Sequence, residues 1–302
     1  MQPADSQSAY LRIGELGRRV GVRPELLRAW ERRYGLLSPL RSSGGFRLYG
    51  DEDERRVLRM LRHLETGVSA AEAARIALNE EDEAPPERAP DMSLPRALAD
   101  VLRQPLEGFD EAGANAALDR LLSTFTYETV LRDAVLPYLA ELGERWRRGE
   151  VSIAQEHFAS AVIRGRLLGL ARGWDGGRGP RALLACAPGD QHDLALICFG
   201  LALRGYGWRI TFLGADTPLA TVAETARVLA PEVVVVTFTL AEQAAGLKAG
   251  LVELSGAAPL ALAGRGTSAA LAEEVGAQYF PNDPFTTASA LAHADGGLLA
   301  SL

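Results

Sequence analysis

Short, continuous apolar runs alternate with longer apolar stretches at helical spacing between residues 180 and 302. Runs rich in branched residues, such as Val233–Val236, are typical of strands buried on both faces of a parallel sheet. The predicted strands are Ala182–Ala187, Trp208–Leu213, Val233–Thr239, Pro259–Ala263 and Ala277–Phe280. The predicted helices lie near 194–204, 218–230, 241–254, 268–276 and 285–300. Residues 180–302 are therefore predicted to form an α/β domain with a doubly wound, five-stranded parallel sheet.

A purely helical pattern precedes this domain, in residues 94–172. Apolar positions recur every three or four residues, and no strand pattern interrupts them. The four predicted helices are Leu94–Leu102, Gly113–Phe125, Tyr127–Gly149 and Ser152–Arg172. A four-helix bundle is the expected arrangement. Residues 79–93 are acidic and rich in proline, which predicts a flexible linker.

The N-terminal region, residues 10–78, is predicted to contain four short helices with a hairpin in the middle. The first helix ends at Gly21, and Pro24 suits the first turn of the second helix. Gly44-Gly45 indicates a hairpin tip. Two further helices are predicted, at Glu52–Leu64 and Ser69–Leu78. This order predicts a winged helix-turn-helix, whose second helix enters the major groove of DNA.

Charge is distributed unevenly along the chain. The formal net charge is −7, yet residues 10–78 hold 14 arginines against 9 acidic residues, whereas residues 79–302 carry a net charge of −11. A basic segment on an acidic body predicts that one end binds a polyanion, although arginine-rich helices also occur as solvated faces. The candidate DNA-binding side chains are Arg23, Arg28, Arg32 and Arg33 of the second helix, and Arg41, Arg47 and Tyr49, which are expected to project as a wing.

Cysteine use and hydropathy indicate the cellular setting. The two cysteines, Cys186 and Cys198, lie in apolar segments and are expected to be small core residues, with no disulfide framework. No apolar run reaches membrane-spanning length, and no secretory signal is visible at the N-terminus. A cytoplasmic location without membrane contact is therefore expected.

Two N-terminal segments carry a family resemblance. They are Arg-Ala-Trp-Glu-Arg-Arg-Tyr-Gly-Leu-Leu, which starts at Arg28, and Gly-Gly-Phe-Arg-Leu-Tyr, which ends at Tyr49. With them, residues 10–78 resemble the winged DNA-binding domain of the MerR regulator family. The resemblance implies a double-stranded DNA operator as a partner.

The loop that follows the first predicted strand of the C-terminal domain carries candidate chemistry. In parallel sheets of this kind, ligands bind outside the carboxyl ends of the strands, where His192 is expected to lie. Asp190 could accept a hydrogen bond from one imidazole nitrogen while the other nitrogen binds a metal. The alternative is that Asp190 caps the next helix and His192 is a solvated loop histidine.

A second candidate group lies at the join between the last two helices of the predicted bundle. Trp146, Glu156 and His157 could form a small polar and aromatic cap above a ligand. The alternative is that Trp146 is a core aromatic residue and that Glu156 and His157 lie on a solvated helix face.

Together the two groups resemble a cobalamin-binding pattern. Asp190-x-His192 is similar to the start of the signature Asp-x-His-x-x-Gly, and Trp146 followed by Glu156-His157 is similar to the cap motif of light-responsive cobalamin regulators. With the MerR-type reader, residues 10 to about 300 resemble the CarH/LitR photoreceptor family. The C-terminal sheet is then expected to be a flavodoxin-like cobalamin-binding domain.

The resemblance implies a role for each matching residue. His192 would be the lower axial ligand of cobalt, oriented by Asp190. The nucleotide tail would lie beside Thr237, Thr239, Gly264 and Gly266, where small residues are expected to leave room. Trp146, Glu156 and His157 would enclose the upper ligand. The implied cofactor is adenosylcobalamin, with methylcobalamin as a second form.

The same resemblance implies a photoreceptor that represses transcription in the dark as a homotetramer and leaves DNA when light cleaves the Co–C bond. It implies a sensor and not an enzyme. Two alternatives stay open: a MerR-type regulator that senses another ligand or corrinoid form without light, and a corrinoid methyl-carrier component of an enzyme. The dimer is a second candidate assembly.

Four positions depart from the family pattern. Ala195 replaces the glycine of the signature, the Ser-x-Leu register falls on Thr237-Phe-Thr239, and the double glycine is Ala263-Gly264. These positions are expected to add bulk beside the tail. Arg147 stands where the family pattern has a histidine that captures cobalt after photolysis, so a bis-histidine product is not expected by that route.

Overall fold

The computed structural model describes residues 10–41, 46–65, 68–80, 94–280 and 283–293. Its residues form two compact units, Met1–Ala159 and Ser160–Leu302, and the division falls inside helix α9 (Ile153–Leu170). The predicted hairpin tip, Gly44-Gly45, lies outside the described residues, as does most of the predicted linker.

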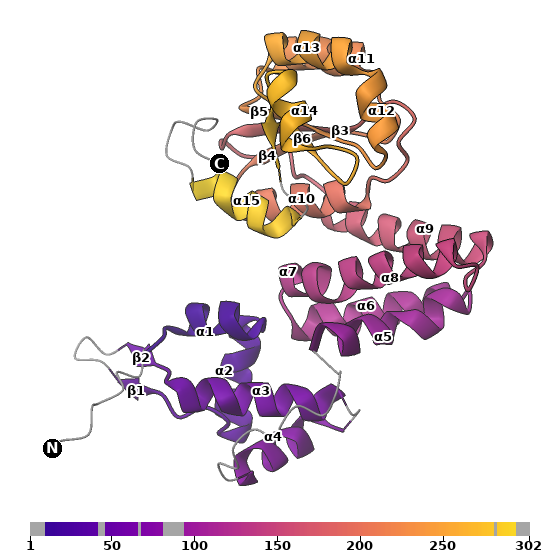
Figure 1. Ribbon diagram of the computed structural model, residues 1–302. Helices are drawn as coiled ribbons and strands as arrows, with labels where there is room; N and C mark the ends of the chain where they lie inside the picture. Colours follow the sequence, from indigo (N-terminus) through magenta and orange to yellow (C-terminus); the bar gives the residue numbers. More distant parts are fainter. Residues whose placement is uncertain (1–9, 42–45, 66–67, 81–93, 281–282, 294–302) are drawn as a thin grey trace, which may run out of the picture. The chain divides into compact units, whose positions relative to one another are not determined.

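The first unit begins with the predicted helix-turn-helix and hairpin (Figure 1). Its elements are α1 (Ile13–Val20), α2 (Pro24–Tyr34), β1 (Leu40–Arg41), β2 (Arg47–Leu48), α3 (Asp51–Glu65) and α4 (Ala70–Asn79). Strands β1 and β2 pair antiparallel. Gly21 ends α1 with φ of +68°, a left-handed conformation that glycine adopts without strain, and Pro24 is the first residue of α2. The predicted order of elements is confirmed.

The helical region of the first unit follows. Its elements are α5 (Leu94–Glu107), α6 (Glu111–Thr124), α7 (Tyr127–Val130), η1 (Leu131–Val135), α8 (Leu136–Arg147) and the start of α9. The third predicted helix, Tyr127–Gly149, is one run with a π-helical turn, η1, in its interior. Buried residues such as Leu102, Leu106 and Tyr138 form the core between these helices.

A shielded ion-pair network joins α5 to α8. Glu107 accepts hydrogen bonds from Arg145 Nη1 at 2.7 Å and Nη2 at 3.0 Å, and only 15% and 19% of their side-chain surfaces are exposed. Arg103 of α5 also reaches across to Glu141 of α8, at 2.7 Å. A bidentate pair shielded from solvent stabilises a helix contact more than an exposed pair does.

The second unit contains the predicted five-stranded sheet, with all neighbouring strands parallel. The strands are β3 (Arg181–Cys186), β4 (Arg209–Gly214), β5 (Val233–Thr237), β6 (Leu260–Ala263) and β7 (Gln278–Tyr279), in the spatial order β4-β3-β5-β6-β7. From β3 the chain continues to β4 on one side, and β5, β6 and β7 then follow on the other side. The strand order therefore reverses at β3, which is the flavodoxin-like arrangement. The predicted fold class is confirmed for this part of the chain.

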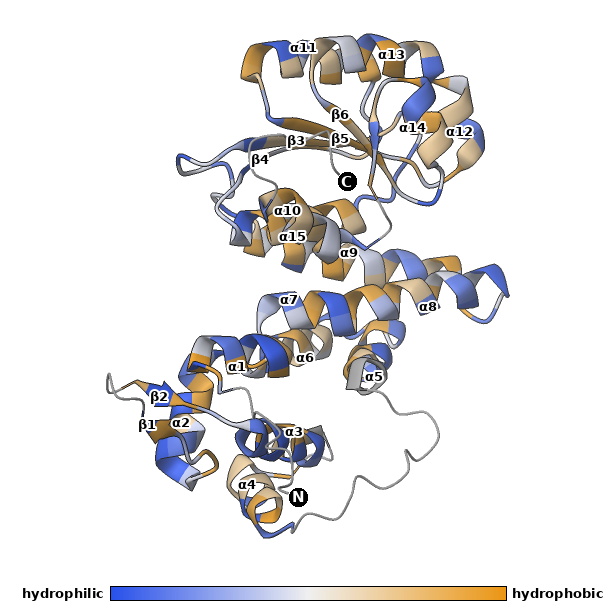
Figure 2. Cartoon of the chain, turned by 60° about the vertical axis from the view of Figure 1, so that its left-hand side comes forward, coloured by the Kyte–Doolittle hydropathy of each residue, from blue (hydrophilic) through white to orange (hydrophobic). Residues whose placement is uncertain are grey.

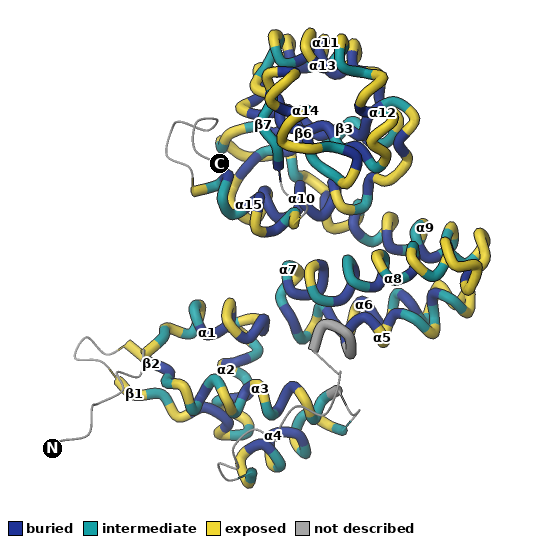
Figure 3. The backbone as a smooth tube through the Cα atoms, viewed as in Figure 1, coloured by how far each residue is buried: buried dark blue, intermediate teal, exposed yellow. Residues whose placement is uncertain are grey.

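Helices cover both faces of this sheet. One face carries α10 (Leu194–Gly205) and α15 (Pro284–His293); the other carries α11 (Leu219–Leu229), α12 (Ala241–Gly246), α13 (Lys248–Ala257) and α14 (Ala269–Glu274). The strands are largely apolar (Figure 2) and mostly buried (Figure 3). Across the described residues, no helix is both long and apolar enough to cross a membrane.

Replacing Glu107 with alanine is expected to lower the free energy of unfolding by about 2 kcal/mol, because the shielded guanidinium of Arg145 loses its bidentate partner. Glu253 provides the matched control, since its pair with Arg227 also joins two helices but is more than half exposed. Glu253→Ala is expected to change stability by less than about 0.5 kcal/mol. Urea unfolding followed by circular dichroism measures both changes; equal effects would contradict the expectation.

Candidate functional site

The loop between β3 and α10 brings together the two residues that the sequence singles out. β3 ends at Cys186, at the carboxyl edge of the sheet, and α10 begins at Leu194. Between them, Asp190 is buried with 2% of its surface exposed, whereas 74% of the His192 side chain is exposed. The imidazole therefore reaches solvent from a loop whose acidic member lies inside the protein.

Asp190 does not cap the next helix. Its Oδ1 accepts hydrogen bonds from His192 Nδ1 at 2.9 Å, His192 N at 3.0 Å and Thr239 Oγ1 at 3.1 Å, and its Oδ2 accepts one from Thr239 N at 2.6 Å. Burial opposes ionisation of this carboxyl, but these donors outweigh it and lower the pKa of Asp190. Because Nδ1 faces the carboxylate, Nε2 is the nitrogen that could bind a metal.

Further hydrogen bonds hold the same loop to its neighbours. Asp216, which follows β4, donates its N–H to the carbonyl of Asp190 and accepts from the N–H of Gly189 at 2.6 Å. The thiol of Cys186 lies 3.8 Å from the carbonyl of His192. Sequence reasoning missed Asp216, because nothing in its own segment links it to a loop 26 residues earlier.

Thr237 and Thr239, which were expected beside a nucleotide tail, differ in their surroundings. Both Thr239 contacts described above go to Asp190, so this residue helps to orient His192 through that carboxylate. Thr237 ends β5, and its buried hydroxyl interacts with the thiol of Cys186, its register partner on β3.

The two glycines of the β6 loop serve packing within the chain. A Cβ on Gly264, which has φ of +95°, would lie 2.4 Å from the carbonyl oxygen of Phe238. A Cβ on Gly266 would lie 2.6 Å from the carbonyl carbon of Leu240. The expectation that these glycines leave open space is therefore wrong at their Cβ positions, because the backbone of the β5 loop fills it. Ala195 is exposed, so its methyl group does not fill the interior.

The residues of the expected cap lie in the first unit, on both sides of the turn between α8 and α9. Trp146 is 45% exposed, so the alternative that it is a core aromatic residue is wrong. Glu156 and His157 lie in the first turns of α9, with 3.6 Å between Oε2 and Nε2. Arg147, at the position of the missing histidine, pairs with Glu144. An exposed indole beside two polar side chains can cover a ligand.

The winged helix-turn-helix carries a hollow of about 410 Å³ lined by arginines. Its lining consists of Arg12, Ile13, Arg28, Arg41, Phe46, Arg47 and Tyr49. Arg12, which sequence reasoning missed, stacks on Phe46 at 4.4 Å from the ring centre. Four guanidinium groups from α2, the hairpin and the start of α1 thus meet around one hollow, which is an arrangement suited to phosphate groups.

The predicted DNA-binding residues do not all project. Tyr49 is buried, with 1% exposed, and its hydroxyl donates to Glu31 at 2.7 Å, so the expectation that it projects with the wing is wrong. Burial and this hydrogen bond raise the pKa of Tyr49. Arg47 pairs with the same Glu31 at 3.2 Å. Arg23 donates to the carbonyl of Ser123.

The other arginines of α2 lie on its surface. Arg28, Arg32 and Arg33 are exposed, and so is Arg41 of β1. Arg28 lies 3.8 Å from Glu25, which is the separation of a loose, solvated pair. Contact of these side chains with DNA stays a prediction.

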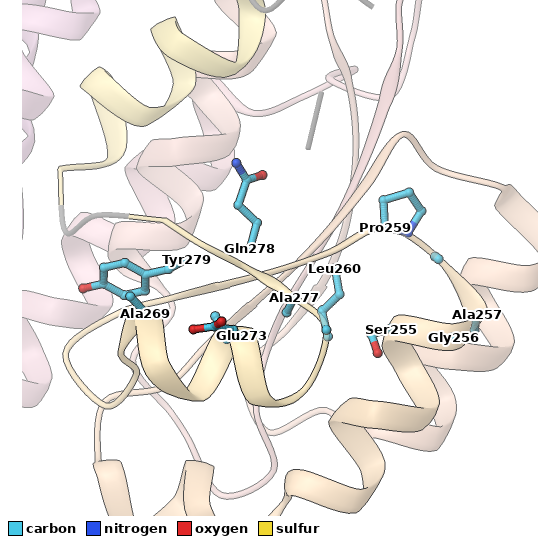
Figure 4. Close-up of a pocket in the computed structure, with 13 residues that line it drawn as sticks. Ser255, Gly256, Ala257, Pro259, Leu260, Ala269, Glu273, Ala277, Gln278 and Tyr279 are labelled. Atoms are coloured by element: carbon cyan, nitrogen blue, oxygen red, sulfur yellow. The ribbon is translucent and has the colours of Figure 1, made fainter. Parts of the chain in front are cut away.

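A separate hollow of about 920 Å³ lies at the opposite edge of the sheet (Figure 4). It is lined mainly by small residues from the end of α13, the amino ends of β6 and β7, and α14. His192 lies at the carboxyl edge, so this hollow is not part of the site around the β3 loop.

Comparison with known proteins gives two family matches. Residues 11–80 match the MerR HTH family regulatory proteins, and residues 98–168 match the B12 binding domain. The repressor CarH of Myxococcus xanthus is 32% identical over 257 residues, which cover 83% of this chain and 86% of the relative. The repressor CarA of the same organism is 38% identical over 234 residues, which cover 76% and 77%.

A solved structure is similar in fold. The monomethylamine corrinoid protein of Methanosarcina barkeri superposes with a TM-score of 0.54 at 18% identity, over 64% of this chain and 96% of that protein. At this identity, the comparison supports the architecture of the helical region and the sheet.

Replacing Gly264 with alanine is expected to lower the free energy of unfolding by at least about 2 kcal/mol, because a side chain at positive φ is strained and the Cβ meets the Phe238 carbonyl. Gly256, inside α13, is the control, since nothing lies within 4 Å of an added Cβ. Gly256→Ala is expected to be neutral or to stabilise by about 0.5 kcal/mol. The midpoints of urea unfolding of the two variants measure both changes. An unchanged midpoint for Gly264→Ala would contradict the packing argument.

Proposed function

Because this chain belongs to the MerR-type, B12-dependent transcriptional repressors related to CarH and CarA, we propose that it is a light-responsive repressor that uses adenosylcobalamin. The chain is a B12-dependent MerR-type transcription regulator and not an enzyme. The form of the cofactor, the response to light and the assembly are the proposed parts.

The observation that carries the proposal is the pairing of an exposed imidazole with a buried carboxylate. His192 turns Nδ1 toward Asp190, which favours the tautomer whose Nε2 has a lone pair for a metal. His192 would hold the cobalt of a bound corrinoid through Nε2. The buried hydroxyl of Thr237 would lie beside the nucleotide tail that His192 displaces.

The cap residues of the first unit are proposed to contact the upper ligand of the cofactor. When bound, adenosylcobalamin supplies a cobalt–carbon bond that light can cleave. Trp146 is exposed and apolar, as expected of a side chain that packs on the adenosyl group. Glu156 and His157 offer an acceptor and a donor for its polar atoms. The cap therefore loses packing area and hydrogen bonds when that group leaves.

DNA affinity follows from assembly. A homotetramer presents several arginine-lined readers at once, and the second reader binds at a high effective concentration after the first. Loss of the cap contacts weakens the assembly, and separated chains lose this gain. Repression in the dark and release in light are the proposed outcome.

One residue favours a second candidate function. Arg147 pairs with Glu144 where the family pattern has a cobalt-capturing histidine. A regulator that lacks this histidine could read the presence of a corrinoid, such as methylcobalamin, without a light step. An identical assembly in the dark and after illumination would favour this candidate.

Adenosylcobalamin added to the full chain in the dark is expected to give the absorption spectrum of a base-off, His-on complex. His192→Ala is expected to remove that spectral form and to weaken binding by at least about tenfold. His293→Ala is the control, since this histidine lies on α15 and bonds to the carbonyl of Ser289. An unchanged spectrum for His192→Ala would reject the proposed ligand.

Size-exclusion chromatography of the loaded protein is expected to show a tetramer in the dark and smaller species after illumination. Operator binding, measured by fluorescence anisotropy, is expected to fall by about 10²-fold or more when the tetramer separates. Trp146→Ala is expected to prevent tetramer formation in the dark, because the exposed indole no longer packs on the adenosyl group. A light-insensitive elution volume in the wild type would reject the photosensory part and leave the B12-dependent regulator.

A further inference from the structure

Asp193, the residue after His192, is the N-cap of α10, immediately before its first residue. Aspartate at this position normally accepts a hydrogen bond from the N–H groups of its own helix. Within the described part of the chain, Asp193 makes no such side-chain bond, although its carbonyl accepts the first helical bond, from Ile197. Asp193 is buried, with 2% of its surface exposed, so its carboxylate requires another partner.

That partner is Arg164 of α9. Its Nε donates to Asp193 Oδ2 at 2.7 Å, and its Nη2 lies 2.6 Å from the same oxygen. The hydrogen bond that Arg164 donates to the Asp193 carboxylate raises the pKa of the guanidinium, so Arg164 stays charged. The arginine side chain is 45% exposed, whereas the carboxylate is buried. Loss of the pair would therefore leave a buried charge without a partner in the loop, but only a solvated charge on α9.

The pair adds one more contact to those that hold the His192 loop. Asp216 and Thr239, which follow β4 and β5, bind Asp190, and Cys186 of β3 contacts the carbonyl of His192. These contacts come from strands or from the loops that follow them. The contact from Arg164 comes instead from a helix that precedes the sheet in the chain, and it acts on the residue next to the imidazole.

Helix α9 also carries two of the proposed cap residues. His157 precedes Arg164 by seven residues, which is about two turns, or roughly 10 Å along the helix, on the same face. The same element therefore carries residues proposed for the upper ligand and the arginine that holds the loop of the lower ligand.

We infer that Arg164 is a positioning residue for the proposed metal ligand: it fixes the His192 loop through its contact with Asp193. The inference rests on the proposed role of His192 as the cobalt ligand. Arg164 touches neither the metal nor the imidazole, so its effect is on the orientation and the affinity of the ligand loop.

The test is a titration of the full chain with adenosylcobalamin in the dark, with the absorption spectrum and the Kd as readouts. Arg164→Gln and Asp193→Asn are each expected to shift the complex away from the His-on spectrum and to raise the Kd about tenfold. The double variant is expected to add little to either single change, since both remove one contact. Arg164→Lys is expected to restore part of the His-on form.

Arg227→Gln is the matched control, because Arg227 of α11 pairs with Glu253 of α13 on the sheet face opposite α10. This variant is expected to keep the wild-type spectrum and Kd. Asp193→Asn leaves no buried charge behind, so it also serves if Arg164→Gln folds poorly, and thermal melts of each apo variant report folding.

Two results separate this inference from the proposed function. If His192→Ala removes the His-on spectrum while Arg164→Gln and Asp193→Asn keep it with unchanged Kd, the inference is overturned and the cobalt ligand stands. If His192→Ala itself leaves the spectrum unchanged, the proposed ligand fails, and the inference fails with it. Additive losses in the double variant would also overturn the inference, because they would place the two residues in separate contacts.

Discussion

The site around His192 depends on the burial of one carboxylate. An ionised aspartate inside a protein is stable only when donors surround it, and Asp190 has donors from its own loop and from Thr239. A shift of either loop would leave the charge without partners. The histidine orientation and the contact between the β3 and β5 loops are therefore held by the same interaction, and the imidazole can reach solvent without freedom to turn.

An acidic residue plays the same organising role in the DNA reader. Glu31 of α2 accepts the hydroxyl of Tyr49 and pairs with Arg47, so the wing is tied to the recognition helix. Because Tyr49 is buried, it supports the wing from inside and is no longer a candidate for DNA contact. Arg12 and Arg28, which line the hollow, remain candidates for phosphate contact.

The chain combines a DNA reader with a B12-dependent sensor. The proposed regulation needs no new chemistry on the DNA side, because the arginine-lined surface stays the same and only the number of linked readers changes. Phosphate contacts of each reader give sequence-independent affinity, and linking several readers raises the affinity further through effective concentration. The charges are divided in the same way: the DNA reader, residues 10–78, carries a net charge of +5, and residues 79–302 carry −11.

The sequence by itself determined the order of elements, the five strands and the two segments that match known families. Local rules suffice there, since apolar runs, Gly21 and Pro24 act through the backbone of their own segments. Only the tertiary structure decided that Thr239 and Asp216 hold the His192 loop, that Tyr49 is buried, and that Arg164 finds Asp193 after 29 residues. These contacts join segments far apart in the chain, and no pattern within one segment specifies which distant charge or hydroxyl will lie beside it.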